Sequence, residues 1–271
     1  MEIDAKPLPT QSHSPRRGVT GFTAHFQRFE FKYPLSPLQA NRILVELMAS
    51  HMRPDPTVAE RHEKRYTVSS LYFDSPGWKC YYENEAGERV RFKLRIRSYE
   101  TAPEAESLMF LEIKRKDDAI ITKDRVAIPH HLYRTVFAEA GDPFQLLDHP
   151  AVIGERAVLE EFLSKLSRFA MRPRVLIRYE RIPLVGRTNE RFRVTLDYGL
   201  EASAVPEFSG HDAFRPVFRG RTILEVKYNN TLPHWFHRIL QRHELRRTKF
   251  SKYFNAVTVL KRSQLLAPSM L

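Results

Sequence analysis

RVRFKLRIR (89–97) is the stretch of this sequence that decides the fold. Cationic and apolar residues alternate along it without a break, and a period of two is typical of a β-strand with two unlike faces. Five cations therefore share one face, where neighbours on the same side lie roughly 6.7 Å apart. At an effective dielectric constant of about 20, each neighbouring pair repels by on the order of 2.5 kcal/mol. The stretch therefore predicts a strand that faces an anionic ligand.

The same alternation recurs at several other places in the chain. These are FLEIKRK (110–116), LEVKY (224–228), RFEFK (28–32), YER (179–181) and FRVTLD (192–197). A solvated strand face is the alternative interpretation, but such a face normally mixes charge signs, whereas these faces carry mostly cations with few carboxylates. If the faces converge on one interior, Arg forks and Lys point charges would bind phosphate groups there.

Period-two segments predict eight strands, at residues 25–33, 65–74, 88–99, 108–116, 122–128, 174–182, 190–198 and 221–228. Amphipathic segments predict packing helices at residues 36–50, 151–169, 233 onward and 251–260. Ser36 as N-cap and Pro37 at the first helical position mark the start of the first helix. We therefore expect an α+β fold, built on a closed or nearly closed antiparallel eight-stranded β-barrel with a few packing helices.

The length of 271 residues suits one domain. Residues 1–21 are rich in Pro, Ser and Gly and predict a disordered leader, residues 22–262 predict the folded domain, and residues 263–271 predict a frayed tail. One cysteine, Cys80, excludes an intrachain disulfide framework and a Cys-rich zinc site, which favours a reducing compartment. No apolar run approaches the roughly 20 residues that span a bilayer, and no signal peptide is visible. We expect a cytoplasmic protein that reaches a membrane only through a partner.

The charge balance indicates the class of ligand. Forty-four Lys and Arg against 32 Asp and Glu leave a net charge of +12, which favours polyanions such as phosphate chains, nucleotides or nucleic acids. Nucleic acid is not expected, because the aromatic residues Phe29 and Phe92 fall on the face opposite the cations rather than among them.

Some residues among the cations suggest more specific chemistry. Glu225 and Glu112 are candidate ligands of a divalent cation that bridges phosphate oxygens, and an ion pair with the neighbouring lysines is the alternative for each. Lys249, Ser251 and Lys252 lie where a loop turns into a helix, so that they and the backbone N–H groups of the helix could hold a phosphate. An ordinary N-cap at Ser251 is the alternative there.

Taken in order, these segments resemble a known family. Its motifs are matched by RFEFKY (28–33), SLYFDSP (70–76), RFKLRIRSY (91–99), FLEIKRK (110–116), YER (179–181), FRVTLD (192–197), LEVKYN (224–229) and KFSKY (249–253). The chain resembles the VTC domain, the polyphosphate polymerase module of the vacuolar transporter chaperone complex. That domain belongs to the CYTH or triphosphate tunnel metalloenzyme superfamily, so the resemblance implies a tunnel lined by basic side chains.

The resemblance also implies roles for individual residues. The catalytic side chains that hold the phosphate chain would be Lys32, Arg95, Arg97, Lys114, Arg181, Arg193 and Lys227. The predicted substrate-binding residues are Arg91, Lys93, Lys116, Lys249, Ser251 and Lys252. Glu225 would hold Mn²⁺ or Mg²⁺, with Glu112 as the second metal candidate. The implied reaction moves the γ-phosphoryl group of ATP onto a growing inorganic polyphosphate, with pyrophosphate as a candidate primer, and a membrane-protein partner could export the product.

One departure from the superfamily bears on the reaction. Its triphosphatases carry Glu-x-Glu-x-Lys on the first strand, whereas this chain has Arg28-Phe-Glu30-Phe-Lys32, with a cation in place of a metal-binding carboxylate. This difference favours polymerisation over hydrolysis. Two alternatives remain open: a metal-dependent CYTH-type triphosphatase, and a non-catalytic module that only binds polyphosphate.

Overall fold

The structure is a computed structural model that describes residues 28–118, 120–139, 141–204, 208 and 213–266. The predicted leader (1–21), the start of the predicted first strand (25–27) and the last residues of the predicted tail (267–271) lie outside these residues. Within the described ranges, no helix is long and apolar enough to cross a membrane.

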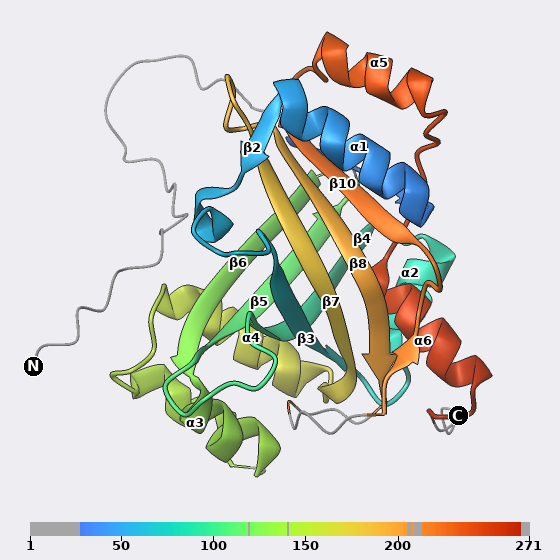
Figure 1. The fold of residues 1–271 in the computed structure, drawn as a ribbon. Helices are drawn as coiled ribbons and strands as arrows, with labels where there is room; N and C mark the ends of the chain where they lie inside the picture. Colours follow the sequence, from blue (N-terminus) through green and yellow to red (C-terminus); the bar gives the residue numbers. More distant parts are fainter. Residues whose placement is uncertain (1–27, 119, 140, 205–207, 209–212, 267–271) are drawn as a thin grey trace, which may run out of the picture.

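One antiparallel sheet forms the centre of the molecule (Figure 1). Its main path runs through β1 (Arg28–Leu35), β10 (Thr222–Asn229), β8 (Arg193–Ser203), β7 (Arg172–Gly186), β3 (Tyr66–Asp74), β4 (Val90–Ser98), β5 (Leu108–Asp117) and β6 (Ile120–Pro129). Two short strands lie off this path: β2 (Met52–Pro54) pairs with β7, and β9 (Arg215–Pro216) pairs with β8. The eight predicted strands are confirmed, and the two short ones were not predicted.

The sheet is strongly curved, so that its two halves face each other. Figure 1 shows β7, β8 and β10 lying across β4, β5 and β6. Lys114 on β5 comes within 3.6 Å of Glu30 on β1, although these strands are far apart in the sheet order. Among the described residues the path ends at β1 and β6 without a ladder between them, so the predicted barrel is not closed by backbone hydrogen bonds.

Helices pack against the sheet, some on its outer surface and some at one end of it. They are α1 (Pro37–Ser50), α2 (Lys79–Ala86), α3 (His130–Tyr133), α4 (Arg156–Arg168), α5 (His234–Arg242) and α6 (Lys252–Arg262), with 3₁₀ turns at Pro56–Val58 and Pro143–Asp148 and a π-helical turn at Arg134–Ala138. The four predicted helices are present, although the second begins at Arg156 rather than near residue 151. Outward-facing apolar residues of the strands pack under them: the ring of Phe73 lies 6.0 Å from that of Phe162 on α4.

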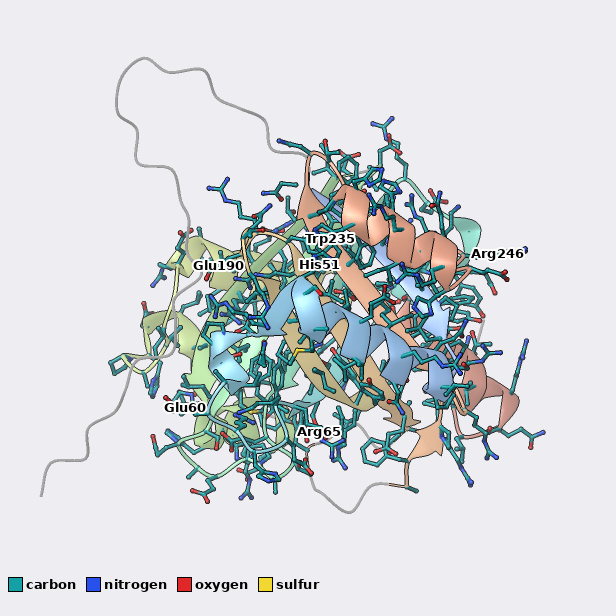
Figure 2. The ribbon with its side chains drawn as sticks, turned by 45° about the horizontal axis from the view of Figure 1, so that its top comes forward. His51, Glu60, Arg65, Glu190, Trp235 and Arg246 are labelled. Atoms are coloured by element: carbon teal, nitrogen blue, oxygen red, sulfur yellow. The ribbon has the colours of Figure 1, made fainter. Side chains whose placement is uncertain are left out.

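The start and end of α1 fix that helix against the sheet. Ser36 and Gln39 form a capping box at its N-terminus, as the Ser-Pro start predicted. At its C-terminus His51 stacks on Trp235 of α5, with ring centroids 4.2 Å apart and planes within 9° (Figure 2). The stack joins α1 to α5, and together they cover one end of the outer face of β1, β8 and β10.

The sequence pattern did not predict α2, because its N-terminus is stabilised by a residue outside the helix. Its N-cap position, Trp78, has a left-handed backbone with φ 59° and offers no capping hydrogen bond. Instead the buried carboxylate of Asp74 accepts hydrogen bonds from the backbone N–H groups of Cys80 and Tyr81, and from the hydroxyl of Tyr253 on α6. Asp74 therefore joins β3, α2 and α6.

Candidate functional site

The alternating cations of the strands gather on the inner face of the curved sheet. In the register of β4 and β5, Arg95 lies opposite Glu112 and Lys93 opposite Lys114. Among the described residues, the cations of the inner face include Lys32, Lys93, Arg95, Arg97, Lys114, Lys123, Arg125, Arg181, Lys227 and Lys252. Four carboxylates lie among them: Glu30, Glu112, Asp197 and Glu225. Positive charge therefore exceeds negative charge on this face, which is the electrostatic setting for a bound polyanion.

Glu112 organises the half of the inner face formed by β4, β5 and β6. Its carboxylate is fully buried and accepts from Arg95 Nε at 2.6 Å, with Arg97 Nη1 at 3.7 Å and Lys123 Nζ at 2.6 Å. Arg95 also donates to the hydroxyl of Tyr72 at 2.8 Å. Burial raises the pKa of Glu112, but these three cations outweigh it and hold the pKa well below its usual range. The two arginines are thus held in fixed positions by one ionised group.

Glu225 organises the opposite half, formed by β1, β8 and β10. Its Oε1 lies 2.5 Å from Lys227 Nζ, and its Oε2 lies 3.9 Å from the ammonium groups of both Lys32 and Lys252. Glu30 lies diagonally across the β1–β10 ladder on the same face, with Oε1 3.1 Å from Lys32 Nζ. Burial raises the pKa of both carboxyls, yet the lysines hold that of Glu225 well below its usual range and lower that of Glu30 to about 2. Both groups are ionised at neutral pH.

A second buried carboxylate fixes Arg181 and Lys252 beside Glu225. Arg181 binds Asp197 through two parallel hydrogen bonds of 2.7 and 2.8 Å, and Lys252 reaches the same carboxylate at 2.6 Å. Asp197 is fully buried, so the three charges form one desolvated cluster. Asp197 lies on the predicted cationic strand face of β8 but was not predicted as a site residue.

The N-terminus of α6 lies between the two halves. Ser251 is its N-cap and accepts from the backbone N–H of Phe254, as the simpler interpretation predicted. The same hydroxyl also accepts from Lys93 Nζ at 2.9 Å, and Lys32 Nζ donates to the carbonyl of Phe250 at 3.1 Å. The segment before α6 therefore connects β1 with β4, and its role in phosphate binding stays a prediction.

Four predicted residues lie away from the centre of the inner face. Arg91 donates to the carbonyl of Glu88, Lys116 donates to that of Asp118, and both lie at the same end of the β4–β5 ladder. Arg193 donates to the carbonyl of Glu190 at 3.4 Å. Lys249 is exposed on the loop before α6. The roles of these four residues in catalysis or substrate binding stay predictions.

Besides Asp197, three residues that contribute to the inner face were absent from the predicted site, although the sequence carried a signal for each. Glu30 stands beside Lys32 in the RFEFK alternation, and its carboxylate does pair with Lys32. Its approach to Lys114 depends on the curvature of the sheet, which the local sequence does not show. Lys123 was missed because the exposed strand β6 is less regular than β4, although Lys123 shares a strand face with Arg125. Tyr72 lies in the SLYFDSP motif but was not predicted as a site residue, whereas its hydroxyl accepts a hydrogen bond from Arg95.

The carboxylates of the inner face are the oxygen donors available to a divalent cation. Among the residues that the structure describes, no group of three or more His, Cys, Asp or Glu side chains forms a ready-made metal site. Glu225 and Glu30 nevertheless present ionised oxygen donors side by side, and Mg²⁺ is commonly held by one or two carboxylates with substrate phosphates and water. The donor set therefore fits a cation that arrives with its phosphate ligand. Glu112, enclosed by three cations, offers less room for one, and its role as a metal ligand stays a prediction.

Comparisons with solved structures return distant likenesses. "Putative adenylyl cyclase HpAC1 from Hippeastrum", described as having a dominant triphosphatase activity, is 18% identical, with 89% of this chain and 98% of that chain covered and a TM-score of 0.48. A "putative adenylate cyclase" from Bacillus halodurans is 12% identical, with coverage of 83% and 95% and a TM-score of 0.46. At TM-scores below 0.5 these likenesses carry no functional argument. No curated protein matches the chain.

A match to a protein-family model also covers most of the chain. The family model of the VTC domain matches residues 27–261, which include every strand of the sheet and nearly all of α6. The matched segment contains all the inner-face residues described above. This chain belongs to the VTC domain family.

Proposed function

We propose that this protein is a metal-dependent polyphosphate polymerase, which transfers the γ-phosphoryl group of ATP onto a growing chain of inorganic polyphosphate. The observation that carries this proposal is the excess of cations over carboxylates on one inner face, where most of these cations are buried or half-buried, in a chain of the VTC domain family. A linear polyanion has phosphates at regular intervals, and cations on several adjacent strands can bind several of them at once. Family membership supports phosphate-chain chemistry, and the polymerase reaction is our inference.

In this proposal the chain's own residues position two anions for an in-line transfer. Arg95 and Lys114 hold the acceptor chain, while Arg97, Arg181, Lys227 and Lys252 hold the triphosphate. A terminal oxygen of the acceptor forms a bond to the γ-phosphorus, the bond from that phosphorus to the β–γ bridging oxygen breaks, and ADP leaves with its electron pair. Such a transfer depends on positioning and charge stabilisation more than on a strong protein base.

Glu225, with Glu30 beside it, would hold the Mn²⁺ or Mg²⁺ ion. The ion would supply charge neutralisation on the phosphate oxygens. The adjacent lysines keep both carboxylates ionised and oriented in the absence of the ion. These lysines can turn to the substrate phosphates when a cation takes their place at the carboxylates.

The decisive assay follows phosphate from ATP. Purified protein incubated with ATP and Mn²⁺, with and without pyrophosphate, is expected to form long polyphosphate chains on a gel together with ADP. Release of free phosphate from ATP or tripolyphosphate without chain growth would identify the protein as a triphosphatase instead. Tight binding of polyphosphate with neither reaction would identify a binding module.

Binding of a phosphate chain is expected to take up a proton near Lys93 at mildly alkaline pH. Burial lowers the pKa of Lys93 most, the charges of Lys114 and Lys32 lower it as well, and together these effects bring it to about 7. At pH 8 the free protein therefore holds this amine mostly neutral, and a bound polyanion raises its pKa and protonates it. At pH 6 the amine is already protonated, so uptake is small.

Calorimetry in two buffers of different ionisation enthalpy measures this uptake with tripolyphosphate in EDTA. We expect Lys93→Met to remove close to one proton of uptake at pH 8. The matched control is Lys165→Met, because Lys165 lies on α4 and pairs with Glu161 on the outer surface. Equal uptake in wild type and Lys93→Met at pH 8 would contradict the prediction.

A further inference from the structure

A row of aromatic rings continues the inner face beyond its cations. Tyr66 on β3, Tyr99 just after β4 and Phe110 on β5 lie on three adjacent strands. The ring centroids of Tyr66 and Tyr99 are 5.6 Å apart, and those of Tyr99 and Phe110 are 5.5 Å apart, with edge-to-face angles of 76° and 66°. All three side chains are partly exposed. We call these three residues the aromatic shelf.

The register of the strands places the shelf directly beside phosphate-binding cations. Phe110 pairs with Arg97 across β4 and β5, and Tyr66 pairs with Arg181 across β3 and β7. The guanidinium carbon of Arg97 lies 6.0 Å from the centre of the Tyr99 ring. Arg97 and Arg181 are both buried, so their fixed positions mark where phosphates can bind relative to the rings.

Further cations lie over the shelf itself. Arg125 on β6 lies 4.7 Å from the centre of the Phe110 ring, and Arg61 lies 5.9 Å from that of Tyr66. A guanidinium group is flat, so ring faces that hold one also offer a stacking surface to a flat base. Inorganic polyphosphate has no apolar part that could use such a surface. The ligand that matches both features has an aromatic ring joined to a chain of phosphates.

We propose that the aromatic shelf binds the base of the nucleoside triphosphate, while Arg97 and Arg181 receive its phosphates. The proposal rests on the proposed function in taking a nucleotide as the phosphoryl donor, and it adds how the protein distinguishes that donor from the inorganic chain. Stacking on an aromatic side chain is tolerant of base identity and strengthens binding of a base considerably. The shelf therefore gives the donor an affinity that a bare triphosphate cannot have.

The test compares two ligands with and without a base. Dissociation constants for ATP and for tripolyphosphate are measured by calorimetry in EDTA, so that neither ligand is turned over. We expect Tyr99→Leu to weaken ATP binding by about 5- to 150-fold, the range that loss of one base–aromatic stack gives. Tripolyphosphate binding should change less than about twofold, and Tyr99→Phe should retain the wild-type preference. Phe110→Leu provides a second variant if Tyr99→Leu does not fold.

The control is Tyr82→Leu, because Tyr82 is an exposed aromatic residue on α2 and contacts Lys261 rather than the inner face. It should leave both constants unchanged. The proposed role of the shelf would be wrong if the shelf variants bound ATP and tripolyphosphate with equally reduced affinity. It would also be wrong if neither folded shelf variant bound ATP more weakly than wild type. Either result would leave the proposed function intact. Failure of wild-type protein to bind ATP at all would overturn both, so the two failures are distinguishable.

Discussion

Glu225→Gln is expected to lower phosphoryl transfer from ATP by about 100-fold or more, because stabilisation of transition-state charge by a metal ion is worth several kcal/mol. The amide that replaces the carboxylate carries no charge and is a poor ligand for Mg²⁺ or Mn²⁺. Binding of tripolyphosphate in EDTA should persist or strengthen, since Lys227, Lys32 and Lys252 lose the carboxylate that now occupies them. The separation of catalysis from binding is the expected signature of a metal ligand.

Initial rates of ADP formation over a range of Mn²⁺ concentrations provide the measurement. The matched control is Glu190→Gln, because Glu190 is 67% exposed and pairs with Arg53 at the surface (Figure 2). It should retain wild-type rates. If folded Glu225→Gln protein forms ADP at a rate within about tenfold of the wild-type rate at saturating Mn²⁺, Glu225 is only an ion-pair partner of the lysines, and the metal ion is held elsewhere.

The strands could be predicted from the sequence because each carries its own periodic signal. RVRFKLRIR shows both faces of β4 without reference to any other segment, and the same holds for β5 and β10. The short strands β2 and β9 could not be predicted, because two or three residues contain no period. For α2 the determining residue was Asp74, whose contribution is a tertiary contact rather than a local pattern.

The arrangement of the site was predictable only in part. The alternation showed which side chains share a face of one strand, but register and curvature decide which strands meet. Glu30 approaches Lys114 only because the sheet curves, and Glu112 lies within reach of Lys123 only through the β5–β6 register. Local sequence could therefore name Glu112 and Glu225 as carboxylates among cations without showing that Glu112 is enclosed by three of them.

That enclosure predicts a large effect on stability. Glu112→Gln is expected to lower the free energy of unfolding by about 3–5 kcal/mol, because it leaves the buried Arg95 and Arg97 without their counter-charge. The pKa of Glu112 is depressed in the folded protein, so its contribution is present above the unfolded value and is lost as pH falls through the folded value. Acid should therefore destabilise wild type more than the variant in the range below about pH 4.

Urea unfolding with and without tripolyphosphate separates a general packing defect from a loss of counter-charge. A bound polyanion can replace the missing carboxylate beside Arg95 and Arg97, so it should raise the unfolding midpoint of Glu112→Gln more than that of wild type.

The control is Glu161→Gln, which breaks a partly exposed pair with Arg115 and should cost less than about 1 kcal/mol. A Glu112→Gln protein that is as stable as wild type would mean that water already compensates the two arginines. A variant whose lost stability tripolyphosphate does not restore would mean that the cluster serves packing alone. Recovery of stability by the polyanion would identify Glu112 as the residue that keeps the phosphate-binding arginines in place while no phosphate is bound.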